Sequence, residues 1–211
     1  MRRLAATLLV LVLAPMMASG GTADPGALLA RIARPAPAST SYVELRFSSL
    51  LATPLVASGE LQFRSADTLY KRIDHPYHEQ MEIRGQDVRV VREGEAPRHF
   101  SLRRVPELRG MLSAFGALLS GDRSALERLF QLNLTEDGVA WTLKLTPRDA
   151  RVSKRLRGIL VTGRDDSPRC LTLTEVDGDA SVMLLGDAVL HELPERLDRA
   201  RLDRHCANPE L

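Results

Sequence analysis

The chain has 211 residues, of which 44% are hydrophobic and 27% charged, and its formal net charge is +2. This composition is typical of one ordinary globular domain or at most two small ones, and it excludes a chain that is disordered throughout. The excess of 29 Lys and Arg over 27 Asp and Glu is too small for a protein whose main partner is nucleic acid.

The start of the chain has the three parts of a secretory signal peptide. Two arginines come first, Leu4–Leu13 forms a short apolar core, and small residues follow as far as Ala23. We predict a cleavable signal peptide over residues 1–23, cut after Gly20 or after Ala23. A retained anchor would need about 20 apolar residues to span a bilayer, which is longer than this core. No cysteine lies near the cleavage zone, so we expect an exported chain that is soluble and carries no lipid anchor.

The next segment predicts one helix followed by antiparallel strands. Asp24 and Pro25 suit the N-cap and the first turn of a helix over Ala27–Ala33. Beyond it, apolar and polar residues alternate, as they do in strands with one buried face. The alternating apolar pairs are Leu45 and Phe47, Leu61 and Phe63, and Met81 and Ile83.

The middle of the chain changes to helical spacing. Apolar residues recur every three or four positions from Pro106 to Leu119. Gly121 suits the end of that helix, and Asp122 suits the N-cap of a second helix over Arg123–Gln131. The strands that follow are marked by alternating apolar residues, namely Val139, Trp141, Leu143 and Leu145, Ile159 and Val161, Leu171 and Leu173, and Val182 and Leu184.

These elements predict a mainly β fold with helices, of the α+β class. The pattern contains ten or eleven strands and no alternation of strand and helix that would give a parallel sheet. We expect a single domain over residues 24–211, built as an open, strongly curved antiparallel half-barrel. The helical hairpin and the N-terminal helix would cover it. If side chains leave the space beneath the hairpin partly empty, that space is an apolar cavity suited to lipid.

Two cysteines, Cys170 and Cys206, lie in the exported part of the chain. Export places them in a compartment that permits disulfides. We predict a bridge that ties the C-terminal tail to the body and contributes roughly 3–4 kcal/mol on the chain-entropy model. Two unconnected thiols are the alternative. A metal site would need more ligands than these two distant residues provide.

The sequence contains no recognisable catalytic set. A nucleophile elbow, a phosphate-binding glycine loop and a zinc-protease motif are all absent from it. His75, His78 and Glu79 come closest to a metal site, but residues three apart on a strand point to opposite faces. Asp177 and Gly178 suit a hairpin turn better than a calcium loop. We therefore expect a protein that is not an enzyme and needs no metal or other cofactor.

A basic run occupies the segment between residues 148 and 157. Its five charges are Arg148, Arg151, Lys154, Arg155 and Arg157. The simpler interpretation is a solvated loop between strands. The functional alternative is a docking patch for phospholipid head groups or for an acidic surface on a partner.

Several segments together resemble a known family. These are the strand Glu44–Phe47, the segment Pro54–Arg64, the helix that ends near Phe130, the strand Trp141–Pro147 and the hairpin Asp177–Ser181. The S-G-E-L-x-F core of the second segment is similar to a G-D/E-L strand of the periplasmic outer-membrane lipoprotein carriers, the LolA-like proteins. The chain resembles a divergent branch of that family.

This resemblance implies a fold and a function. It implies an open antiparallel barrel that holds acyl chains and carries lipoprotein or lipid cargo through the periplasm, as a monomer, from an inner-membrane donor to an outer-membrane acceptor. One departure limits it. An arginine that takes part in lid closure in the best-known carriers is replaced by Ser65, and its role is not carried over to the neighbouring Arg64.

We expect acyl chains to lie between a sheet face and a helical face, where each buried methylene contributes about 0.8 kcal/mol. The predicted lipid-binding residues are Leu45, Phe47, Leu61, Phe63, Met111, Leu112, Phe115, Leu119, Phe130 and Trp141. The alternative is that these stripes are ordinary core faces. The rival function is a LolA-like sensor or binding module that detects envelope lipids and regulates a membrane partner.

Overall fold

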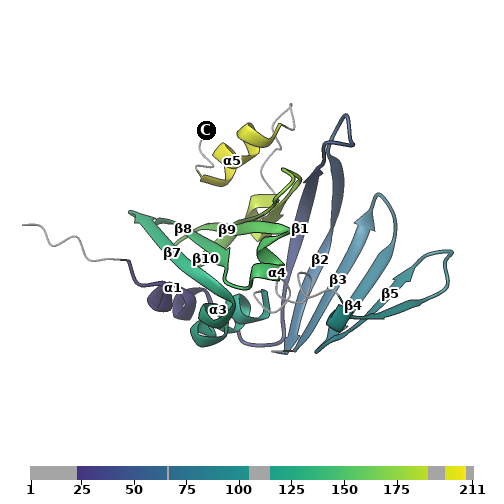
Figure 1. Cartoon of the computed structure of the whole chain (residues 1–211), viewed down its shortest axis with the longest axis horizontal. Coiled ribbons are helices and arrows are strands. Elements are labelled where there is room, and N and C mark those ends of the chain that lie inside the picture. Colours follow the sequence, from purple (N-terminus) through teal and green to yellow (C-terminus); the bar gives the residue numbers. More distant parts are fainter. Residues whose placement is uncertain (1–22, 66, 105–114, 190–197, 208–211) are drawn as a thin grey trace, which may run out of the picture.

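The computed structural model describes residues 23–65, 67–104, 115–189 and 198–207 (Figure 1). Its main feature is one antiparallel sheet of eleven strands, in the order β6-β5-β4-β3-β2-β1-β11-β10-β9-β8-β7. The strands are β1 (Ala38–Phe47), β2 (Leu55–Ser65), β3 (Thr68–His75), β4 (Glu79–Arg84), β5 (Asp87–Arg92), β6 (Arg98–Ser101), β7 (Phe130–Asp137), β8 (Ala140–Pro147), β9 (Leu156–Arg164), β10 (Ser167–Glu175) and β11 (Ala180–Leu185). The open antiparallel sheet predicted from the sequence is confirmed.

The sheet consists of two meanders that meet at one seam. Strands β1 to β6 pair in chain order, and so do β7 to β11. The first and last strands then pair with each other, from Tyr42 opposite Leu185 to Phe47 opposite Ala180. The connection from β6 to β7 contains η1 (Leu102–Arg104), a helical segment at residues 115–120, and α3 (Arg123–Leu129). This connection joins the two edges of the open sheet.

Local sequence signals account for the first helix. Asp24 caps α1 (Pro25–Ile32), because its carboxylate accepts hydrogen bonds from the backbone N–H groups of Gly26 and Ala27. The residues Leu28, Leu29 and Ile32 on one side of this helix are buried. The predicted helix and its cap are therefore confirmed.

The second helix of the predicted hairpin is shorter than expected. Asp122 caps α3 as predicted, at 2.9 Å from the backbone nitrogen of Ala125. The helix ends at Leu129, whereas the sequence predicted it as far as Gln131. Phe130 already has extended backbone and pairs with Pro147 of β8. Strand pairing therefore takes over two residues earlier than the helical spacing suggests.

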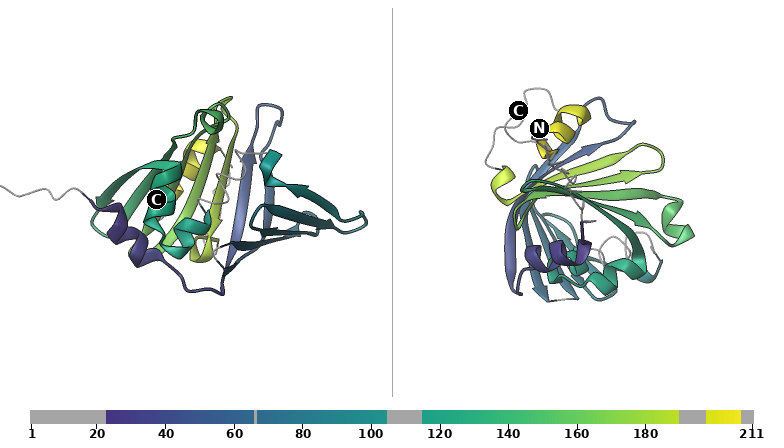
Figure 2. Two further views of the ribbon diagram at one scale, coloured as in Figure 1. Left: turned by 60° about the horizontal axis from the view of Figure 1, so that its bottom comes forward. Right: turned by 90° about the vertical axis from the view of Figure 1, so that its left-hand side faces the viewer.

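Helices α1 and α3 lie against the face of the sheet that we call the inner face (Figures 1 and 2). Their apolar side chains share one core cluster with Trp141, Leu143 and Leu145 of β8. The ring of Trp141 lies against Gly163, where an added Cβ would come within 2.1 Å of the ring. The indole Nε1 donates to the carbonyl of Asp165 at 3.1 Å. This end of the inner face is closely packed.

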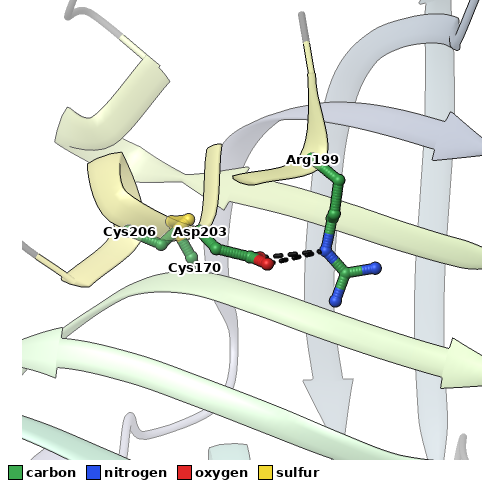
Figure 3. Close-up of a disulfide and its surroundings, with 4 residues drawn as sticks. All are labelled: Cys170, Arg199, Asp203 and Cys206. Atoms are coloured by element: carbon green, nitrogen blue, oxygen red, sulfur yellow. Dashed lines mark hydrogen bonds and ion pairs between the residues drawn. A yellow bond between two sulfur atoms is a disulfide. The ribbon is translucent and has the colours of Figure 1, made fainter. Parts of the chain in front are cut away.

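A further helix, α5 (Arg199–Ala207), covers the opposite face, which we call the outer face. Its residues Leu202 and Cys206 pack in a second cluster with Leu45 of β1. The predicted disulfide between Cys170 and Cys206 is present and ties α5 to β10 (Figure 3). The shorter elements η2 (Gly186–Val189) and α4 (Ala150–Ser153) complete the fold.

Candidate functional site

A cavity of about 440 Å³ lies on the inner face, between the two meanders. Its walls come from strands of both halves of the sheet and from Phe115 of the helical segment at residues 115–120. Its apolar lining consists of Leu61, Leu69, Met81, Ile83, Phe115, Leu156, Leu171, Leu173 and Met183. A volume of this size lies within the usual range for sites that bind one small molecule.

The same cavity also has charged walls. These come from Glu44 and Arg46 of β1, Lys71 of β3, Arg155 and Glu175. Because side chains alternate along a strand, Tyr42, Glu44 and Arg46 share one face of β1. The central strand of the sheet therefore presents polar residues to the cavity.

Glu44 forms a fully satisfied network in this wall. One of its carboxylate oxygens accepts a hydrogen bond from Lys71 Nζ, and the other accepts one from Ser181 Oγ, both at 2.5 Å. Burial by itself would raise the pKa of Glu44. The charge of Lys71 and the hydrogen bonds from Lys71 and Ser181 outweigh burial and hold that pKa below its usual value of 4.5. Glu44 is therefore an anion whose charge is balanced by Lys71 and whose oxygens accept hydrogen bonds from Lys71 and Ser181.

A smaller cavity of about 170 Å³ adjoins the first. The two cavities share Glu44, Arg46, Lys71 and Met81 as lining residues. The additional lining residues of the smaller cavity are Leu55, Ala57, Ile73, Tyr77 and Glu79. Arg46 thus lies on the wall that both cavities have in common.

The buried Glu79 is also paired. It accepts a hydrogen bond from Arg92 at 2.9 Å, and the Arg92 guanidinium lies 4.4 Å from the centre of the Tyr77 ring. Within the described part of the chain, no group of three or more His, Cys, Asp or Glu side chains could hold a metal ion. The arrangement around Glu79 is an ion pair with a cation–π contact.

The glycine of the S-G-E-L motif has a structural role beside the cavity. A Cβ at Gly59 would lie 1.9 Å from the carbonyl oxygen of Arg72 on the neighbouring strand. Gly59 is opposite Tyr42 in the register, and the Tyr42 hydroxyl donates to that same carbonyl at 3.1 Å. Because Gly59 has no side chain, the Tyr42 hydroxyl can reach β3 across β2.

The structure divides the predicted lipid-binding residues into groups. Leu61 and Phe115 line the larger cavity. Phe130 and Trp141 are buried in the core beneath the helices. Phe63 is buried, and Leu119 is half-buried, with its carbonyl accepting a hydrogen bond from the backbone of Arg34 at 2.9 Å. Met111 and Leu112 lie outside the described residues.

Leu45 and Phe47 require a correction. Both were predicted to share a sheet face with Leu61, but they pack in the outer-face cluster with Cys170 and Leu202. The apolar side of β1 is covered by α5, so the polar side of the strand faces the cavity. Alternation alone defines two faces of a strand and does not say which face meets which helix.

Most of the cavity wall was not singled out from the sequence. Met81, Ile83, Leu171 and Leu173 were recognised as strand residues but not as site residues. Among the charged residues of the wall, Arg155 was singled out as part of the basic run, whereas Glu44, Arg46, Lys71 and Glu175 have no sequence signal of their own. Their place follows from the register, which sets Arg46 opposite Ser181 on one side and Leu55 on the other.

The basic run lies at the connection between β8 and β9, which includes the one-turn helix α4, and its five basic residues are exposed. Arg148 donates to the carbonyl of Phe130 at 3.1 Å, and Arg157 donates to that of Val176 at 3.0 Å. Arg151 lies 3.5 Å from the carboxylate of Asp149, Lys154 caps α4, and Arg155 lines the cavity. Docking by this run stays a prediction.

A family model described as outer membrane lipoprotein carrier protein LolA-like matches residues 17–207. The chain belongs to this family. LolA-like proteins are periplasmic carriers that bind lipoprotein or lipid cargo and are not enzymes. The resemblance seen in the sequence is therefore confirmed. No curated protein matches the chain.

Several solved structures are similar to this LolA-like chain. A LolA superfamily protein from Nitrosomonas europaea is 14% identical, with 90% of this chain and 100% of that chain covered and a TM-score of 0.42. An outer membrane lipoprotein-sorting protein domain from Vibrio parahaemolyticus is 9% identical, with 85% and 94% covered and a TM-score of 0.42. LprF from Mycobacterium bovis is 12% identical, with 81% and 96% covered and a TM-score of 0.35.

The helices of the described residues were compared with the length and hydropathy that a membrane span requires. None of the helices that those residues form is both long enough and apolar enough to cross a bilayer. The predicted signal peptide at residues 1–23 falls almost entirely outside the described residues.

Proposed function

We propose that this LolA-like protein is an exported periplasmic carrier that binds acyl chains in the inner-face cavity and transfers them toward the outer membrane. The observation that carries this proposal is the cavity of about 440 Å³ with a largely apolar lining. An apolar space on a sheet face that is otherwise closely packed gives methylene groups a place away from water. Membership of the carrier family supports the same use.

The energetics suit a reversible carrier. Each methylene that enters the cavity contributes about 0.8 kcal/mol, so a chain of several methylenes binds without any covalent step. Cargo must also leave. The lining residue Phe115 belongs to the helical segment at residues 115–120 in the connection between the two sheet edges, and this segment is not part of the hydrogen-bonded sheet. Displacing it would open the cavity and leave the strand pairing intact.

The binding step can be tested on protein purified from the periplasm. Native mass spectrometry is expected to show co-purifying lipid, and delipidated protein is expected to take up added fatty acid or lipopeptide. We expect Leu171→Trp, which fills the cavity, to lose uptake. Leu160→Trp is the matched control, because Leu160 is 36% exposed and lies outside the cavity lining. Wild-type protein that is free of lipid and ignores both ligands would contradict the proposal.

The transfer step and the export step need separate measurements. Fluorescent lipid in inner-membrane vesicles is expected to reach outer-membrane vesicles faster when the wild-type protein is added. Sequencing the N-terminus of the periplasmic protein is expected to find a start at residue 21 or 24. Uptake without transfer would support a binding module in place of a carrier.

A further inference from the structure

The two ends of the inner-face cavity differ in polarity. Ser181 lies opposite Arg46 in the register. Glu175 lies opposite Leu156, the residue that follows Arg155 in the chain. These polar lining residues gather where β1 ends and β11 begins. Toward the opposite end of the strands the lining is apolar, with Leu69 opposite Ile83. The site therefore has charged residues beside Leu156 and Leu173 at one end, and apolar lining residues at the other.

The charges at the polar end are not all neutralised by one another. Lys71 is matched by Glu44, which also accepts from Ser181. Arg46 is exposed, lines both cavities and lies near enough to the carboxylates of Glu44 and Asp179 to attract them electrostatically. It nevertheless forms no direct hydrogen bond or ion pair with any of the residues that the structure describes. A guanidinium in such a position has five donors available for a ligand.

We propose that the cavity binds a single-chain amphiphile with an anionic head group, an inference that rests on the proposed function. Its carboxylate or phosphate pairs with Arg46, and its chain runs toward Leu61, Ile83 and Phe115. Arginine is suited to this task because its planar fork of donors matches the oxygens of both anions. The volume of about 440 Å³ fits one chain.

The alternating pattern of β1 supports this assignment. The strand uses its apolar residues Val43, Leu45 and Phe47 for the outer-face cluster and turns its polar residues toward the cavity. An apolar side chain at position 46 would suffice if the cavity only solvated hydrocarbon. A charged residue there instead gives the ligand a fixed orientation, with the head at the shared wall of the two cavities.

The test uses three ligands with the same chain: laurate, dodecyl phosphate and dodecanol. Their affinities are measured by displacement of a neutral fluorescent probe from the delipidated full-length protein. We expect the wild type to bind an anionic ligand about tenfold more tightly than dodecanol, as one charge-assisted hydrogen-bonded pair provides. The preference between laurate and dodecyl phosphate identifies which anion the site selects.

The variant Arg46→Gln is expected to lose this tenfold preference and keep the affinity for dodecanol. Arg64→Gln is the matched control, because Arg64 is exposed, hydrogen-bonds to Gln62 and lies outside both cavity linings. Equal affinity of the wild type for all three ligands would overturn the head-group assignment and leave the carrier function standing. An equal loss of all three ligands in Arg46→Gln would also overturn it. Failure of the wild type to bind any of them would instead contradict the carrier function.

Discussion

The two faces of the sheet are built from the same strands and have opposite properties. On the outer face, Leu45, Val182 and Leu184 are fully buried against α5, and a disulfide fixes that helix to β10. On the inner face, the helices cover one part of the strands, and the space beside them is an open cavity. One face is closed by packing and a covalent bond, and the other retains room.

This difference suggests a division of labour between neighbouring residues. On the proposed function, residues one position apart on β1 and β10 serve stability or binding according to the face on which they lie. Cys170 is bonded to α5, whereas Leu171 lines the cavity. Changes on the two faces should therefore have separable effects.

Removing the disulfide should have the largest effect on stability and little effect on binding. The bridge joins residues 36 apart in the chain, and losing it in Cys170→Ala/Cys206→Ala is expected to cost about 3–4 kcal/mol of unfolding free energy. Urea denaturation measures the change. Ligand affinity of the folded variant should stay within a factor of two or so of the wild type. A larger loss of affinity would show that the two faces are coupled.

Truncating matched leucines on the two faces should separate their roles. Leu45→Ala on the outer face removes a side chain that is fully buried, so we expect a loss of about 3 kcal/mol. Leu173 on the inner face borders the cavity and is half-buried. We therefore expect Leu173→Ala to lose about 1 kcal/mol of unfolding free energy. Thermal and urea unfolding measure both. Equal losses would remove the distinction between a packed and an open face.

Narrowing the cavity should weaken binding and leave stability nearly unchanged. Leu173→Phe places added atoms in the space for cargo, and displacing about two methylenes at 0.8 kcal/mol each lowers affinity about tenfold. Leu160→Phe, at an exposed position outside the cavity lining, is the control. Fluorescent-lipid titration with a parallel melting curve measures the effect. Unchanged affinity in Leu173→Phe would place the cargo elsewhere.

The smallest expected effect is on the pH dependence of stability. Since Lys71 and Ser181 hold the pKa of Glu44 below 4.5 in the folded state, its contribution is fully present above that pH. It is lost as the pH falls through the lower, folded pKa. We expect Glu44→Gln to lose less unfolding free energy than the wild type on acidification below pH 4.5. Unfolding free energies, measured by urea denaturation at each pH, that fall equally with pH in the wild type and the variant would contradict this.

Much of the fold follows from local patterns. The N-cap residues Asp24 and Asp122 predict where their helices begin. The alternating residues predict the strands of the sheet, and the two cysteines predict the disulfide. The covering of each sheet face cannot be predicted in this way, because the alternation at Leu45 and Phe47 does not say which helix packs against their side of the strand. Helix α5 was missed, although Leu202 and Cys206 have helical spacing and Asp198 accepts a hydrogen bond from the backbone of Arg201. Recognising that helix would have assigned the apolar side of β1 correctly.

The seam between the meanders has a consequence for how the chain folds. All strand pairs but one join neighbours in the sequence, whereas β1 and β11 bring together residues roughly 140 positions apart. Closing so long a loop is slow relative to forming hairpins. We expect the amides that form hydrogen bonds between β1 and β11 to gain protection last in pulsed hydrogen exchange. Until then, two unpaired strand edges would be exposed at the centre of the future sheet, and they are the segments at which folding chains would aggregate.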